Sequence, residues 1–139
     1  MKANGKVIVV TGAGAGIGRA VALELLARGA AGIAAVDLNA EGLAETVQLA
    51  GANAAKVSVH TVNLTDRKAV AKLPAQVIKQ HGQVDGYAHV AGIIQHFVKI
   101  ADLSYDEFEK VMNVNFWGTV TLYKEFIPEL LKRPEAQIL

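Results

Sequence analysis

The chain has 139 residues, a formal net charge of +1, 52% hydrophobic residues and no cysteine, which suits one domain with its own core. The missing cysteines exclude disulfides, thiolate metal sites and a cysteine nucleophile, and the singly dispersed lysines and arginines give no charge pattern for a nucleic-acid partner. No apolar run approaches the roughly 20 residues that cross a bilayer and no secretory signal opens the chain, so we expect no membrane partner and a cytoplasmic location.

Strands and helices alternate from the first residues onward. The apolar run Val7–Val10 predicts a strand, the glycines after it a tight turn, and Ile17–Arg28 a helix that Gly29 ends. The apolar run Gly32–Val36 predicts a second strand, and Asn39 is well placed to cap a second helix.

The middle of the chain repeats this alternation. The segment KVSVHTVN, residues 56–63, predicts a third strand. Thr65 is expected to cap a third helix that ends near Gly82, and Pro74 inside that helix is expected to kink or split it. Val84–Ala91 predicts a fourth strand.

A long fourth helix is expected to follow the segment SYDE. In that segment Ser104 and Glu107 have the spacing of a capping box, in which each side chain bonds the backbone of the other residue. The helix is expected to run toward Pro128, and Pro134 marks a break before Gln137–Leu139, which has the character of an opening strand.

The order of elements predicts an α/β protein with a mainly parallel sheet, right-handed crossovers and helices on both faces. No linker, repeat or low-complexity segment divides the chain. In such sheets ligands bind beyond the carboxyl ends of the strands, at the point where the strand order reverses.

The segment TGAGAGIG, residues 11–18, lies between the first strand and the first helix. Gly12 permits a tight turn, Gly16 lets the backbone approach a pyrophosphate, and Gly18 lets the helix pack on the sheet. The start of the helix presents free N–H groups to phosphates. We therefore predict Gly12, Gly16 and Gly18, together with Ala15 and Ile17 between them, as cofactor-binding residues; a merely flexible loop is the alternative.

Asp37 ends the second strand 19 residues after Gly18, where a carboxylate accepts hydrogen bonds from the ribose hydroxyls of adenosine. Its charge repels a 2′-phosphate, and neither Ala15 nor the neighbouring Leu38 supplies a cation to neutralise one. The pattern favours NAD over NADP and places Asp37 and Leu38 at the cofactor. The alternative is a solvated carboxylate that helps start the second helix.

These motifs resemble the short-chain dehydrogenase/reductase family, whose glycine motif TGxxxGxG matches residues 11–18. The resemblance covers essentially the whole chain and implies a Rossmann-type, doubly wound parallel sheet, with residues 1–139 as an incomplete dinucleotide-binding domain that stops at the start of strand five. It also implies an NAD-dependent oxidoreductase that exchanges a hydride with a small alcohol or carbonyl substrate.

The resemblance assigns further cofactor residues on the next two strands. In NLTD the family usually has an aspartate where Asn63 stands, and that aspartate and the following main chain, here at Leu64, hold the adenine ring. The side chain of Asn63 still offers a carbonyl acceptor, so we expect this contact to be altered and not lost. The family motif NNAG falls on residues 89–92, where Ala91 and Gly92 still bring backbone near the ribose. His89 departs from that motif, and we interpret it as a hydrogen-bonded structural residue.

The resemblance assigns the catalytic role of the family's active-site asparagine, which helps hold a water in the proton relay, to Asn115; a partly exposed polar residue is the alternative. The family's serine and its YxxxK pair have no match, because no tyrosine here has a lysine four residues later. We expect those residues beyond Leu139 and expect the 139 residues alone to be inactive.

Two other functions stay open for the chain as it stands. One is a non-catalytic nucleotide-binding module. The other is a fragment that self-associates through the fourth helix, as family members commonly do, using the aromatic residues Phe108, Phe116, Trp117 and Phe126. Gln95 and His96 in the loop after the fourth strand are candidates for substrate contact, and the spacing of the histidines predicts no metal site.

Overall fold

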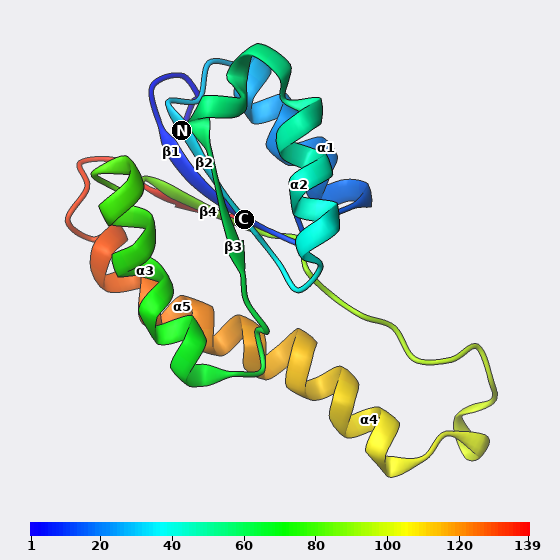
Figure 1. Cartoon of the computed structure of the whole chain (residues 1–139). Helices are drawn as coiled ribbons and strands as arrows, with labels where there is room; N and C mark the ends of the chain where they lie inside the picture. Colours follow the sequence, from blue (N-terminus) through cyan, green and yellow to red (C-terminus); the bar gives the residue numbers. More distant parts are fainter.

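A computed structural model describes residues 1–139 and shows one parallel sheet with helices on both faces (Figure 1). The strand order is β3-β2-β1-β4-β5. The strands are β1 (Val7–Thr11), β2 (Gly32–Asp37), β3 (Val57–Thr61), β4 (Gly86–His89) and β5 (Gln137–Ile138). This arrangement confirms the predicted doubly wound α/β fold, and its switch point lies between β1 and β4.

The alternation of side chains along β1 divides the core into two layers. Val7 and Val9 face one side of the sheet, where they pack with α3 (Arg67–His81) and α5 (Gly118–Leu130). Ile8 and Val10 face the other side, where they pack with α1 (Gly16–Ala27) and α2 (Ala40–Leu49). Because β1 is buried at every position and apolar from Val7 to Val10, it forms the centre of the sheet.

The helix starts follow the sequence with one exception. Asn39 caps α2, as predicted, by accepting the N–H of Gly42. The prediction that Thr65 caps the third helix is wrong. Asp66 is the cap and accepts the N–H groups of Lys68 and Ala69, since it stands directly before the first helical residue.

Pro74 does not split the third helix. The helix α3 continues from Arg67 to His81, and Gly82 follows in the left-handed conformation with φ of 79°. Pro74 is buried with Leu73 and Val77 in the layer shared with α5, so tertiary packing holds the helix together across the missing backbone donor.

The fourth helix is continuous but not uniform. It consists of α4 (Tyr105–Met112), a π-helical segment (Asn113–Trp117) and α5. Only half of the predicted capping box forms: Ser104 accepts the N–H of Glu107, but the Glu107 carboxylate binds His96 instead of returning to Ser104. Short 3₁₀ turns at Gly51–Lys56 and Ile100–Asp102 complete the structure.

A buried carboxylate joins three parts of the sheet. Asp85, whose side chain is fully buried, accepts the N–H of Val7 at 2.9 Å and pairs with Arg133 at 2.7 Å, and Gln83 donates to it at 2.7 Å. Burial opposes ionisation, but the hydrogen bonds from Val7 and Arg133 outweigh it and hold the pKa of Asp85 below its usual value.

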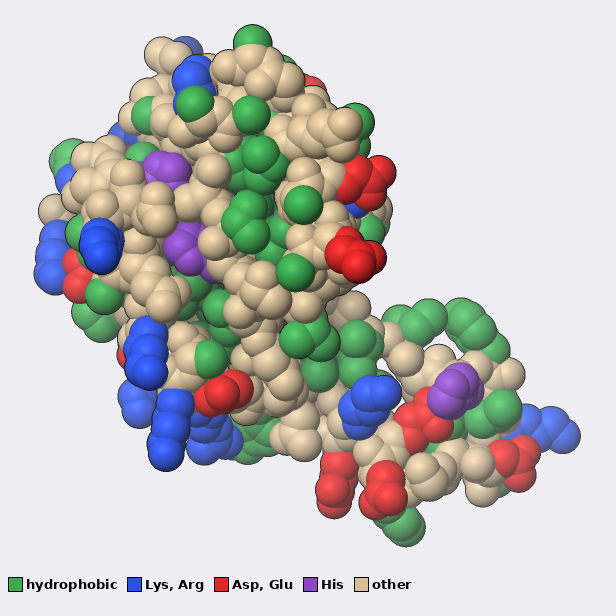
Figure 2. Space-filling model, viewed as in Figure 1, with side chains coloured by type: hydrophobic (Ala, Val, Ile, Leu, Met, Phe, Trp, Pro, Cys, Tyr) green, Lys and Arg blue, Asp and Glu red, His purple; other side chains and the backbone are tan.

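One part of the chain extends away from the rest of the molecule, residues 1–93 and 118–139, which we call the body. Residues 94–117, which we call the arm, comprise the loop after β4, the second 3₁₀ turn, α4 and the π segment, and they project to one side (Figures 1 and 2). No side chain of α4 or of the π segment is buried. No helix in the structure combines the length and apolar character needed to cross a membrane.

Candidate functional site

A pocket lies at the carboxyl ends of β1, β2, β3 and β4. The space between the atoms that line it is about 610 Å³, part of it open to solvent. Residues predicted from the sequence supply most of its lining: Gly12, Asp37, Leu38, Asn63, Leu64, Ala91 and Gly92. The prediction missed Val36, Val62, Ile93 and Val114, each of which adjoins a predicted site residue in the sequence.

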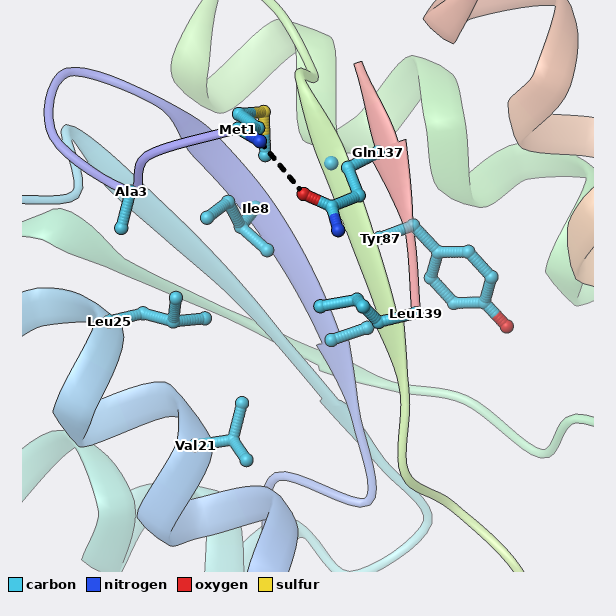
Figure 3. Close-up of a pocket in the computed structure, with 10 residues that line it drawn as sticks. Met1, Ala3, Ile8, Val21, Leu25, Tyr87, Gln137 and Leu139 are labelled. Carbon is cyan, nitrogen blue, oxygen red and sulfur yellow. Dashed lines mark hydrogen bonds between the residues drawn. The ribbon is translucent and has the colours of Figure 1, made fainter.

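A second pocket lies between α1 and the edge formed by β4 and β5 (Figure 3). Val21 and Leu25 of α1 face Ile8 and Leu139 across it, and the N-terminal ammonium group bonds Gln137 at 3.2 Å. It is lined mainly by apolar residues, and none of the predicted site residues contributes to it. The predicted site residues that line a pocket at all therefore line the first of these two.

The glycine turn is shaped by two close approaches. Gly12 has φ of 70°, and a Cβ there would lie 3.0 Å from the backbone of Ala91. A Cβ on Gly18 would overlap the carbonyl oxygen of Gly12. These glycines let β1, the end of β4 and the start of α1 meet in one place, as the sequence predicted for the turn.

The start of α1 offers free backbone donors beside this turn. The N–H groups of Gly16, Ile17 and Gly18 make no hydrogen bond within the chain, and the cap residue Ala15 provides no side-chain acceptor. No acidic residue occupies the first turn. Such an unpartnered helix start attracts an anion such as a phosphate. Gly16 has φ of 50° and open space around it.

Asp37 is held with acceptor capacity to spare. Its Oδ2 accepts the N–H of Gly14 at 2.9 Å, and its Oδ1 accepts the N–H of Asn39 at 2.9 Å. A carboxylate has about four acceptor positions, so each oxygen retains one for a ligand hydroxyl. Gly14 is a further close approach, because a Cβ there would lie 2.9 Å from the Asp37 carboxyl group.

Arg19 supports the turn and was not recognised from the sequence, although it directly follows the last glycine of the motif. Its guanidinium donates to the carbonyl of Gly14, to Thr46 at 3.0 Å and to Glu45 at 2.6 Å. Thr46 in turn donates to the carbonyl of Ala13 at 2.7 Å. A cation therefore does lie near the glycine turn, but α2 already engages and neutralises it.

Asn63 is engaged differently from the prediction. Its Oδ1 accepts both the N–H of Thr65 at 3.0 Å and the Thr65 hydroxyl at 2.9 Å. These bonds use both lone pairs of the oxygen, so the expected carbonyl acceptor for adenine is already occupied. The side-chain amide nitrogen is the group that Asn63 leaves free at the pocket. Leu64 is buried beneath it.

Asn115 lies in the π segment and is fixed at both ends. Its Oδ1 accepts the N–H of Ile93 at 2.9 Å and its Nδ2 donates to the Ile93 carbonyl at 2.8 Å. Its own carbonyl accepts the Thr119 hydroxyl at 2.6 Å. Asn115 does not line the pocket, but Ile93 and Val114 do. Single-turn π segments are frequent at functional sites.

The histidine of β4 is hydrogen-bonded, as predicted. His89 contacts Thr11 at 2.9 Å and Thr119 at 2.7 Å through its two ring nitrogens. Burial lowers its pKa, which favours the neutral ring. The structure does not bring Gln95 and His96 into the pocket. Both are exposed on the arm, and His96 pairs with Glu107 at 2.8 Å.

None of the three tyrosines is placed for acid/base work at the pocket. Tyr87 is buried, its hydroxyl has no partner, and burial raises its pKa. It stacks on Phe126 at 5.7 Å and meets Tyr123 edge-on at 5.9 Å. Tyr105 is 86% exposed on the arm. The arrangement provides groups that bind and orient a ligand, without a proton donor poised beside it.

Comparison with known proteins gives concordant results. A family model described as short chain dehydrogenase matches residues 6–139. The 3-oxoacyl-[acyl-carrier-protein] reductase FabG of Thermotoga maritima is 30% identical over 139 residues, which cover 100% of this chain and 56% of that protein. The chain spans about half the length of the curated relatives that it matches.

Solved structures show the same fold with either cofactor. The structure of NAD⁺-bound xylitol dehydrogenase superposes with a TM-score of 0.92 at 29% identity and covers 99% of this chain and 53% of that one. A metagenomic short-chain oxidoreductase in complex with NADP superposes with a TM-score of 0.88 at 26% identity and covers 97% of this chain and 61% of that one.

Proposed function

The chain belongs to the short-chain dehydrogenase family, and from this premise we propose that it is the cofactor-binding part of an oxidoreductase acting on an alcohol or carbonyl compound with NAD. The observation that carries the proposal is the pocket at the strand ends, where Gly12, Asp37 and Gly92 meet. Its position at the switch point of a doubly wound sheet is where such folds bind dinucleotides. When bound, the nicotinamide accepts or donates the hydride.

The residues present fit this cofactor in three places. The free N–H groups at Gly16, Ile17 and Gly18 suit a pyrophosphate, with Ala15 leading into them. Asp37, with Leu38 beside it, has acceptor positions for two ribose hydroxyls. We assign the adenine to the pocket wall at Asn63 and Leu64, and the second ribose to the backbone at Ala91 and Gly92.

We propose NAD as the cofactor in preference to NADP. The Asp37 carboxylate would face a 2′-phosphate with like charge. Arg19 is the cation close to the turn, and its guanidinium is committed to Gly14, Thr46 and Glu45. Both cofactors occur among structures similar to this chain, so the preference rests on these contacts.

The chain's own residues would bind and orient, with little proton transfer. Asn115, placed beside the pocket through Ile93, is the candidate catalytic residue and would help to hold a water. The tyrosines give no acid/base group near it, which supports binding without turnover by the 139 residues. A nucleotide-binding module without catalysis is the corresponding second function.

We further propose that copies associate through the fourth helix. Phe108, Met112, Phe116 and Val120 recur at four-residue intervals along α4, the π segment and the start of α5. Their side chains are 39%, 50%, 48% and 39% exposed. An exposed apolar stripe of this kind is typical of a surface that another chain covers.

The direct test is isothermal titration of the 139-residue chain with NAD and with NADP. We expect NAD to bind more tightly, and Asp37→Ala to weaken it by roughly tenfold to a hundredfold, since two charge-assisted hydrogen bonds are lost. The matched control is Asp66→Asn, which removes one carboxylate charge outside the pocket and retains a capping side chain.

The outcomes separate the alternatives. Binding of NAD without oxidation of an alcohol panel supports the proposal for this chain. Absence of NAD binding by a folded chain overturns it, and self-association in that case would leave the interaction fragment as the better description. Equal weakening by the Asp66→Asn control would remove the assigned role of Asp37.

A further inference from the structure

His89 is hydrogen-bonded to two elements of the fold, β1 and α5. It stands at the end of β4, between Thr11 of β1 and Thr119 of α5. Thr11 leads directly into the glycine turn, and Thr119 contacts the carbonyl of Asn115. The ring therefore spans the gap between the turn that we assign to the cofactor and the helix that carries the candidate catalytic asparagine.

The hydrogen bonds of Thr11 determine where the proton of His89 lies. The Thr11 oxygen accepts the N–H groups of Val90 at 3.1 Å and Ala91 at 3.2 Å. Both of its lone pairs are then used, so its remaining contact, with His89 Nδ1 at 2.9 Å, is one in which the Thr11 hydroxyl donates. Nδ1 is therefore an acceptor and carries no proton.

The other ring nitrogen of His89, Nε2, faces Thr119. A neutral histidine with a bare Nδ1 carries its proton on Nε2, which donates to the Thr119 oxygen at 2.7 Å. The Thr119 hydroxyl is then free to donate to the carbonyl of Asn115 at 2.6 Å. Every donor along this chain of four residues has one acceptor, and a single tautomer satisfies all of them.

We propose that His89 is a positioning residue that holds Asn115 through Thr119, in a fixed Nε2–H tautomer. The bond from Thr119 sets the carbonyl of Asn115, and the two bonds to Ile93 set its side chain. Both tethers lead back to the end of β4. The role in catalysis rests on the proposed function, but the mechanical link is a property of this chain's own side chains.

The length of the imidazole is what makes the link. In asparagine the side-chain oxygen and nitrogen both lie one bond beyond Cγ, as Nδ1 does in histidine. An asparagine at position 89 is therefore able to meet Thr11 but not Thr119. Glutamine is one bond longer and places a donor where Nε2 lies. The two substitutions divide the contacts of His89 into a Thr11 half and a Thr119 half.

The test is NMR spectroscopy of the 139-residue chain without nucleotide. A long-range ¹H–¹⁵N spectrum of His89 is expected to show a proton on Nε2 and none on Nδ1. The amide of Ile93 is the second probe, because its hydrogen bond is to Asn115 Oδ1. Its exchange with water is expected to accelerate roughly fivefold in His89→Asn and in Thr119→Val, as befits loss of one hydrogen bond.

Conservative and control variants distinguish positioning from general loosening. His89→Gln and Thr119→Ser retain the link and are expected to keep Ile93 exchange within about twofold of the parent. Thr121→Val is the matched control, since Thr121 makes the same bond to a carbonyl four residues earlier, Trp117 at 2.8 Å, without contacting a histidine. It is expected to leave the Ile93 amide unchanged.

Three results would overturn the inference. They are a proton on Nδ1, Ile93 exchange unaffected by both His89→Asn and Thr119→Val, and equal acceleration in Thr121→Val. Titration with NAD on the same samples keeps the two proposals apart. Failure of the parent chain to bind NAD counts against the proposed function only, because the positioning link is measured in the free protein.

Discussion

The glycine-turn region and the arm are built in opposite ways. Around the turn, Arg19, Asp37 and Thr46 direct their hydrogen bonds to the backbone of residues 13 and 14, and the turn packs on β4. The arm projects from the rest of the molecule (Figure 2). Its helix α4 buries no side chain, and Phe97 and Tyr105 are 90% and 86% exposed. The chain thus organises its glycine turn from within and leaves the side chains of the arm largely exposed.

The largest effect on the free energy of unfolding is expected when a buried charged side chain of the body is removed. Asp85→Ala would remove the carboxylate partner of Arg133, which would keep only its bond to Gln83, and would leave the N–H of Val7 without its acceptor. Because the carboxylate of this ion pair is fully buried, we expect its removal to lower the free energy of unfolding by about 4 kcal/mol, which urea denaturation would measure. Glu129→Ala, which breaks the exposed pair with Lys132, is the control and should cost less than about 1 kcal/mol.

The same site predicts an acid limit to stability. Because the folded-state pKa of Asp85 is depressed, its contribution is fully present above the unfolded value of about 4 and is lost as the pH falls below it. Unfolding curves of the parent and of Asp85→Asn should therefore approach each other between about pH 5 and pH 2. A constant difference across that range would contradict the assignment.

A smaller but more local effect is expected in the turn. In Gly18→Ala the added methyl group overlaps the Gly12 carbonyl, and backbone cannot move aside without opening the turn. We expect a loss of about 3 kcal/mol in unfolding free energy together with loss of NAD binding. Gly51→Ala is the control that adds a methyl group without a clash, because Gly51 has open space around it. Its φ of 54°, a strain that Gly18 does not have, should itself cost about 1 kcal/mol while NAD binding is spared.

The contrast also shows what the sequence was able to predict. The β-branched run at Val7, the glycine turn and Asp37 are local patterns with local consequences, so the strands, the switch point and most of the pocket lining followed from them. The contacts of Arg19 with Glu45 and of His89 with Thr119 join residues 26 and 30 positions apart. No periodicity encodes such pairings, which depend on how the helices dock.

Some local predictions failed because adjacent residues compete for one role. Thr65 and Asp66 are both good caps, and the residue next to the first helical turn takes the position. Thr65 instead occupies the oxygen of Asn63, which altered the expected adenine contact. The π segment adds a residue per turn without changing the apolar pattern enough to be visible.

The exposed apolar stripe of the arm and the start of α5 raises the question of whether a second copy of the chain covers it in solution. Phe116 is 48% exposed in the apolar stripe, so Phe116→Ser should weaken self-association by about 2 kcal/mol, a roughly thirtyfold increase in the dissociation constant. Sedimentation equilibrium measures it. Leu131→Ser, at an 80% exposed apolar position past α5, is the control. Equal effects would show that the stripe is not the interface.

The smallest effect on stability is expected from a contact made within the arm, between Glu107 and His96. Glu107 accepts the N–H of His96 at 2.6 Å and pairs with its ring, and these hydrogen bonds lower the pKa of Glu107. Both groups lie outside the core, so Glu107→Gln should leave the urea midpoint of the chain unchanged while the amide of His96 exchanges faster with water. If the midpoint moves as well, the arm unfolds together with the body, and the division between a self-organised turn and an independent arm fails.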